Sequence, residues 1–150
     1  MEEEGFSGFL NYVEPRYKPP HRTTFSSTHM PNLYNEVFES IKVEVGNAKN
    51  ISITTDIWTA NPSTNFISLT AHWLSEMFYH KVAVLDARPF PGHHTAVHIQ
   101  GQIESGLSKF EIPKECVVCC VTDGCANMVA GTRLTGMPHL TCFIPTPTHH

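Results

Sequence analysis

The stretch Ile51–Trp58, which reads ISITTDIW, decides the fold of this chain. Apolar and polar residues alternate along it, as in a β-strand with one buried face. One face carries Ile51, Ile53 and Ile57, and the other carries Ser52, Thr54 and Asp56. A carboxylate in a half-buried strand is costly unless it is hydrogen-bonded, paired or bound to a cation, so Asp56 needs an explanation.

A second stretch also ends an apolar run with Thr-Asp. Residues 117–123 read VVCCVTD, which predicts another strand with an aspartate at its end. Two strands that each deliver Thr-Asp indicate one shared site, with Asp56 and Asp123 as its candidate residues. Alternatively, Asp123 simply caps the helix that follows it.

The composition indicates one globular domain with a substantial core. Of the 150 residues, 41% are hydrophobic and 16% are charged, which argues against a disordered protein. The formal net charge of −4 argues against a generally basic surface for nucleic acid. Lysine and arginine residues are scattered and form no run, so a nucleic-acid contact would depend on a local patch.

Five cysteines, an odd number, form a poor disulfide framework and indicate a reducing compartment. The acidic start Met1–Glu4 lacks the basic region of a signal peptide. No apolar run approaches the roughly 20 residues of a membrane helix. These features alone predict a cytosolic protein without a membrane partner.

Periodicity and turn residues divide the chain into an arm, a core and a tail. Residues 1–30 read as an N-terminal arm, because glycines and prolines break any long element there, although residues 6–13 could form a short helix. Residues 31–144 carry the pattern of the core. Residues 145–150 are polar and proline-rich, and we expect them to form a disordered tail.

The core is expected to contain three helices and five strands. The helices are predicted at 33–45, 95–107 and 126–134, and the strands at 50–58, 65–74, 78–85, 116–122 and 139–144. The first three strands form an antiparallel meander. The helix between strands three and four makes strand four parallel to a neighbour. The sequence therefore predicts an α/β protein with a mixed sheet.

The order β-β-β-α-β-α-β resembles the ribonuclease-H-like fold, here preceded by a helical arm. In that fold one acid lies on strand one and another at the end of strand four. These strands are neighbours, so the acids converge and can bind divalent cations. Asp56 and Asp123 fall at those positions.

Two motifs resemble the core signatures of hAT-superfamily transposases, and most of all those of the BED-type zinc-finger proteins derived from them. They are TTDIWT at residues 54–59 and VTDGCANM at residues 121–128. Supporting likeness lies at Gly5-Phe6, Glu14–Tyr17, Thr70–Trp73, Val84–Asp86, His94-Thr95 and Pro138–Phe143. The resemblance therefore covers nearly the whole chain.

The resemblance implies DNA transposition or DNA binding, and a location in the nucleus. It also implies a two-metal site for Mg²⁺ or Mn²⁺, in which Asp56 matches the first catalytic acid and Asp123 the second. Hard cations prefer oxygen ligands, and paired metals stabilise both oxygens of phosphodiester cleavage. DNA and related transposase-like chains are the implied partners.

The sequence also departs from this family pattern. The third catalytic acid, a glutamate on a later helix, does not occur before the chain ends, and the BED finger and the C-terminal region are missing. Gly124 replaces a more usual asparagine, and Pro145 stands where the family continues into a helix. We therefore expect a truncated, domesticated or decayed relic without catalysis that still binds nucleic acid or protein. A metal-dependent nuclease with paired aspartates is the alternative.

The cysteines allow two interpretations. Cys116 and Cys119 have zinc-like spacing, which His139 and Cys142 could complete. The simpler interpretation is that they are free cysteines of a core strand, where neighbouring side chains face opposite ways. Cys125 lies near a helix start but has no identifiable basic partner, so we expect no nucleophile there.

Histidines and tryptophans also have simple interpretations. His94 and His98 lie one helical turn apart, as solvated histidines of a helix start would. Trp58 and Trp73 are expected in the core, because neither lies within the basic patch that single-strand binding needs. Strand five is expected to be an exposed edge.

Overall fold

The computed structural model describes residues 2–60 and 64–142. Its internal contacts form two compact units, with the boundary between Glu39 and Ser40. The first unit is helical, and the second contains a sheet with helices packed on it. Both candidate aspartates belong to the second unit.

The first unit is more helical than the sequence predicts. Helix α1 covers Glu2–Val13, and a second helical run comprises α2 (Arg22–Thr24), a π-helical turn (Phe25–His29) and α3 (Met30–Gly46), whose last residues belong to the second unit. The prediction that no long element forms within residues 1–30 is therefore wrong. Pro31 lacks an N–H and its ring crowds the preceding turn, so the wider π turn before it lets the helix continue.

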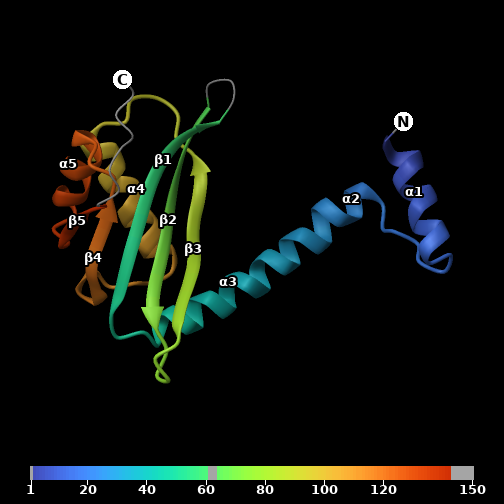
Figure 1. The fold of residues 1–150 in the computed structure, drawn as a ribbon, viewed down its shortest axis with the longest axis horizontal. Helices are drawn as coiled ribbons and strands as arrows, with labels where there is room; N and C mark the ends of the chain where they lie inside the picture. Colours follow the sequence, from blue (N-terminus) through green and yellow to red (C-terminus); the bar gives the residue numbers. More distant parts are fainter. Residues whose placement is uncertain (1, 61–63, 143–150) are drawn as a thin grey trace. The chain divides into compact units, whose positions relative to one another are not determined.

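The second unit is built on one five-stranded sheet (Figure 1). Its strands are β1 (Ile51–Ala60), β2 (Thr64–Leu74), β3 (His80–Pro89), β4 (Val117–Thr122) and β5 (His139–Thr141). Their order is β3-β2-β1-β4-β5. β1, β2 and β3 pair antiparallel, whereas β4 is parallel to β1 and β5 is parallel to β4. This arrangement confirms the predicted mixed sheet of the ribonuclease-H-like type.

Helices α4 (Ala96–Lys109) and α5 (Ala126–Leu134) pack together on one face of the sheet, and a short 3-10 helix (Lys114–Cys116) precedes β4. Two glycines allow the close approach. A Cβ atom on Gly106 would lie 2.6 Å from Leu69 Cδ2 of β2, and one on Gly131 would lie 2.7 Å from Ile99 Cβ of α4. Within the described part of the chain, no helix is long and apolar enough to cross a membrane.

The core lies between the sheet and these two helices. On the core face of β1 and β2, the buried residues are Ile51, Ile53, Thr55, Ile67, Leu69, Ala71 and Trp73. Trp73 is therefore buried as predicted. Trp58 is 40% exposed and stacks on Phe66, so its predicted core position is wrong. Strand alternation places Trp58 on the sheet face that α4 and α5 leave open.

The ends of β3 and β5 differ from the sequence prediction. β3 begins at His80 because the N–H of Phe78 donates to Ser75 O and closes a tight turn. It continues to Pro89, which an edge strand tolerates because its outer backbone groups need no ladder partner. β5 is shorter than predicted, and it is the edge strand beside β4, as expected. The predicted disordered tail, 145–150, lies outside the described residues.

Candidate functional site

Asp56 lies in the second half of β1, on the open face of the sheet. Strand alternation sets this orientation, since the neighbouring Thr55 is buried on the core face. Asp56 is exposed, and its Oδ1 accepts the N–H of Ile57 at 2.8 Å. The expected half-buried position is therefore wrong, and water and a backbone N–H solvate this carboxylate.

Asp123 follows β4 directly and begins the turn into α5. It is half-buried, and its Oδ1 accepts the N–H of Cys125 at 3.2 Å. Cys125 is the N-cap residue of α5 and makes no side-chain cap hydrogen bond. Asp123 therefore satisfies a backbone donor at the helix start, which agrees with the capping interpretation.

The two aspartates belong to neighbouring parts of the sheet. β1 and β4 are parallel, and their paired residues end with Thr54 opposite Val121. Asp56 lies two residues further along β1, and Asp123 lies two residues past Val121, just beyond the end of β4. Extending the register by two residues along each chain would bring Asp56 beside Asp123. Their role in catalysis or metal binding stays a prediction.

Both carboxylates raise the pKa of the Cys125 thiol. A hydrogen bond with Asp123 and the negative charge of Asp123 raise the thiol pKa above its ordinary value, and the charge of Asp56 adds to the shift. Nearby negative charge disfavours the thiolate. The Cys125 thiol at the start of α5 therefore lies close to Asp123 and within reach of the charge of Asp56.

We expect Asp123→Asn to accelerate alkylation of Cys125 by iodoacetamide near neutral pH. Loss of the charge lowers the thiol pKa, so more of the thiol is ionised at a given pH. Asp56→Asn should act in the same direction but more weakly. Mass spectrometry of the Cys125 peptide across a pH series measures the rate. Glu76→Gln, which removes an exposed negative charge in the β2–β3 turn, is the control.

An unchanged alkylation profile in Asp123→Asn would contradict the contact between this carboxylate and the thiol. An effect of Glu76→Gln as large as that of Asp56→Asn would show that Cys125 senses only the net charge of the protein.

Two buried threonines fix the strand ends beside the aspartates. Thr55 Oγ1 donates to Ser68 O of β2 at 2.7 Å, and Thr122 Oγ1 lies 2.9 Å from His139 Nε2 of β5. Each Thr-Asp pair therefore ties its strand to a neighbour through the threonine and directs the aspartate to the other face. Sequence reasoning missed the contact of Thr122 with His139, because it depends on the register of β4 and β5.

His72 is a further polar residue that sequence reasoning missed. Its Nε2 lies 3.2 Å from Thr54 Oγ1, and its ring stacks on that of His80. Burial lowers the pKa of His72, and the charge of His80 lowers it further. His72 of β2 therefore favours its neutral form and contacts Thr54 of β1, the residue two positions before Asp56.

The zinc-like spacing of the cysteines does not assemble a metal site. Cys119 Sγ donates to Ser52 Oγ at 3.5 Å, whereas Cys120 is buried on the opposite face, where burial raises its pKa to about 11. In residues 2–60 and 64–142, no three His, Cys, Asp or Glu side chains are close enough to hold a metal ion. None of the five cysteines forms a disulfide. The core-strand interpretation holds for Cys120 alone, because Cys116 lies in the 3-10 helix before β4 and Cys119 is only half-buried.

The histidines before α4 make structural contacts. Thr95 is the N-cap of α4, and its Oγ1 accepts the N–H of His98 at 3.3 Å. His94 Nε2 lies 3.1 Å from Phe90 O, and its ring stacks on the buried ring of Phe90. These contacts favour the helix-start interpretation over a role at a site.

Asp56 and Asp123 fit one hard cation better than two. Their carboxylate oxygens are the ligands that Mg²⁺ and Mn²⁺ prefer. Each carboxylate already accepts a backbone N–H, and in the described residues no three His, Cys, Asp or Glu side chains, the neighbouring Cys125 included, are arranged to hold a metal ion. A two-metal site must hold both ions about 4 Å apart, which needs more ligands than this pair supplies. The two-metal site implied by the resemblance therefore does not fit these residues.

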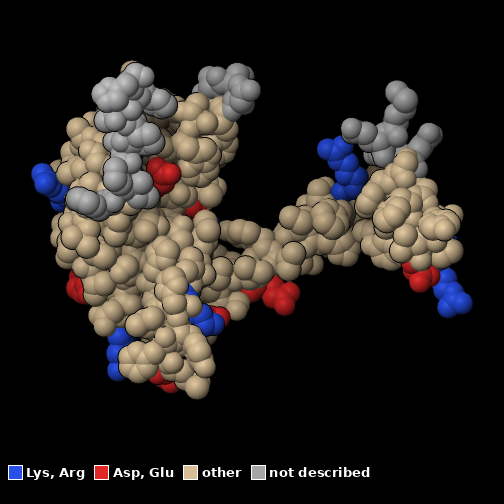
Figure 2. Space-filling view, viewed as in Figure 1, with Lys and Arg blue, Asp and Glu red and all other residues tan. Residues whose placement is uncertain are grey.

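Basic side chains are dispersed over the face of the molecule drawn in Figure 2. Figure 2 shows lysine and arginine as separate spots on the face that it draws. Four of them form ion pairs, namely Lys42–Glu111, Lys81–Glu44, Arg88–Asp86 and Lys114–Glu104. This distribution differs from the continuous basic stripe of a typical nucleic-acid-binding surface.

Comparison with known proteins gives a consistent picture. Residues 54–137 match the family model of the ZBED1 RNase-like domain. The chain is 28% identical over 153 residues to zinc finger BED domain-containing protein 6 of Mus musculus, covering 93% of this chain and 16% of that protein. It is 30% identical over 114 residues to zinc finger BED domain-containing protein 4 of Homo sapiens, covering 69% of this chain and 10% of that protein. It is 22% identical over 131 residues to a putative AC transposase of Zea mays, covering 87% of this chain and 16% of that protein. The chain thus spans a small part of each relative, and the region matched by the family model contains both aspartates.

Proposed function

The chain belongs to the ZBED1 RNase-like domain family of transposase-derived proteins, and we propose that it acts in the nucleus as a binding domain without catalysis. The similarity to hAT transposases and BED-type zinc-finger proteins, expected from the two Thr-Asp motifs, is confirmed. The absence of catalysis, the nuclear location and the partner are the new parts of this proposal.

The carboxylate pair is the observation that carries the proposal. Asp56 and Asp123 occupy neighbouring strand ends, but in the described residues no third ligand accompanies them. Each carboxylate also has a structural task, because each accepts a backbone N–H. A cation at this pair would be held by two side chains and water, which favours weak and reversible binding.

The surface favours a protein partner, in particular a related transposase-like chain, over DNA. The net charge is −4, and the basic side chains are dispersed, so attraction to phosphates is weak. The β2–β3 turn instead presents Leu74, Met77, Phe78 and Tyr79, each more than half exposed. Ser75 holds this turn in shape with three hydrogen bonds, since it accepts the N–H groups of Phe78 and Tyr79 and donates its own N–H to Tyr79 O. Aromatic and methionine side chains are enriched where proteins bind one another.

A metal-dependent nuclease is the second candidate, and the convergence of the two aspartates favours it. The two candidates differ in DNA cleavage with Mg²⁺ or Mn²⁺. We expect the parent protein to be as inactive as Asp56→Asn and Asp123→Asn. Metal-dependent cleavage that either substitution abolishes would establish the second candidate. For the partner class, tight DNA binding at physiological salt would contradict a protein partner.

A further inference from the structure

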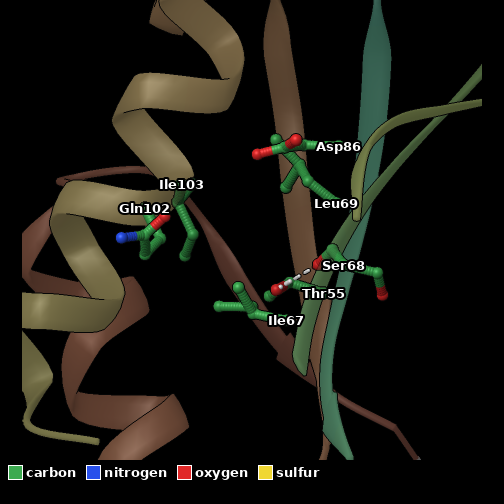
Figure 3. A pocket seen from close by; sticks show the side chains of 7 residues that line it. All are labelled: Thr55, Ile67, Ser68, Leu69, Asp86, Gln102 and Ile103. Atoms are coloured by element: carbon green, nitrogen blue, oxygen red, sulfur yellow. Dashed lines mark hydrogen bonds between the residues drawn. The ribbon is translucent and has the colours of Figure 1, made fainter. Parts of the chain in front are cut away.

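A small cavity lies between α4 and the sheet, beside Thr55 in the middle of β1 (Figure 3). It is lined by Thr55, Ile67, Ser68, Leu69, Asp86, Gln102 and Ile103. Its volume of about 10 Å³ is close to what a single water molecule needs. We propose that this cavity is a binding site for one long-lived water molecule. The proposal is independent of the function proposed above.

Gln102 presents an acceptor that no protein donor reaches. Its Oε1 is buried and has no hydrogen-bond partner. In Figure 3 the side chains of Gln102 and Asp86 lie on opposite sides of the space between α4 and the sheet. A buried acceptor without a donor destabilises a protein, and such groups in native proteins usually bind ordered water.

Arg88, on β3 but outside the lining of the cavity, is the ion-pair partner of Asp86. Its Nε is buried without a hydrogen-bond partner, although it lies only 2.6 Å from Asp86 Oδ2. The short distance makes an ion pair, but the N–H is not aimed at that oxygen. The guanidinium is held in place by Nη2, which donates to Ser105 Oγ of α4 at 3.2 Å.

One water molecule in the cavity has two acceptors within its lining. It donates its two hydrogens to Gln102 Oε1 and to the Asp86 carboxylate, both of which belong to side chains that line the cavity. The water therefore links β3, which carries Asp86, to α4, which carries Gln102.

A rotated amide is the competing explanation. If the oxygen and nitrogen of Gln102 exchange places, its Nε2 donates to Asp86 directly, and no acceptor remains for water. The two arrangements differ in which atom faces Asp86 and in whether the cavity is occupied. They are therefore separable by direct observation.

High-resolution crystal structures of the whole chain and of Gln102→Met test the proposal. We expect one ordered water within hydrogen-bond distance of Gln102 Oε1 in the parent protein, and its loss in Gln102→Met. Gln100→Met is the matched control, because Gln100 lies on the same helix and its amide already donates to Glu104 and to Leu134 O. This control should keep the water.

Nuclear magnetic resonance gives a second readout in solution. A cross-peak between a long-lived water and the amide of a lining residue such as Leu69 should be present in the parent protein and absent in Gln102→Met. An empty cavity in the parent structure, or Gln102 Nε2 donating to Asp86, would overturn the proposal even if the variant does not fold.

Discussion

Phe90→Ala is expected to lower the free energy of unfolding by about 3–5 kcal/mol. Phe90 connects β3 to α4 and is completely buried, with 0% exposure. Its ring stacks on His94 at a centroid distance of 4.7 Å and lies 4.5 Å from that of His98. The truncation removes these contacts and leaves a cavity at the start of α4. The surrounding sheet and helix can fill such a cavity only in part, because interiors are closely packed.

Phe78→Ala is the matched control, since Phe78 is 82% exposed in the β2–β3 turn. Its substitution should change the free energy of unfolding by no more than about 0.5 kcal/mol. Equilibrium unfolding in urea, followed by tryptophan fluorescence, measures both variants. If Phe90→Ala loses no more stability than Phe78→Ala, Phe90 is not an anchor between the sheet and α4.

Gly131→Ala is expected to have the next largest effect, a loss of about 1–3 kcal/mol. The added Cβ would lie 2.7 Å from two side-chain carbons of Ile99 and 2.9 Å from the backbone oxygen of Ala96. A backbone oxygen cannot move aside as the end of a side chain can. The substitution therefore pushes α5 away from α4, and with it the helix that begins beside Asp123.

Gly101→Ala should change stability in the opposite direction. Gly101 lies in the exposed face of α4, and a Cβ there would meet nothing within 4 Å. Alanine favours the helix over glycine, so a gain of roughly 0.5–1 kcal/mol is expected in the same urea experiment. A gain in stability for Gly131→Ala as well would show that α4 and α5 do not cross as closely as described.

The sheet and its two aspartates could be predicted because their causes are largely local. The alternation of apolar and polar residues in 51–58 predicts β1, and the apolar run before Asp123 predicts β4. The helix between β3 and β4 then requires a parallel crossover, which makes β4 a neighbour of a meander strand. Together these rules place Asp56 and Asp123 on the two neighbouring central strands, β1 and the end of β4.

Other features could not be predicted because distant segments decide them. Which face of the sheet α4 and α5 leave uncovered determines the exposure of Trp58 and of Asp56. The register of β4 and β5 determines that His139 contacts Thr122 rather than a cysteine. The helix before Pro31 depends on a π turn, which neither helix propensity nor the presence of proline predicts.

DNA cleavage in the presence of Mg²⁺ or Mn²⁺ tests the central claim most directly, namely that the pair Asp56 and Asp123 has converged geometry without catalysis. A supercoiled plasmid is incubated with the parent protein, with Asp56→Asn and with Asp123→Asn, and nicked product is measured over time. We predict that all three proteins leave the plasmid equally intact. Nicking by the parent protein that needs the divalent cation and disappears in both variants would contradict this account.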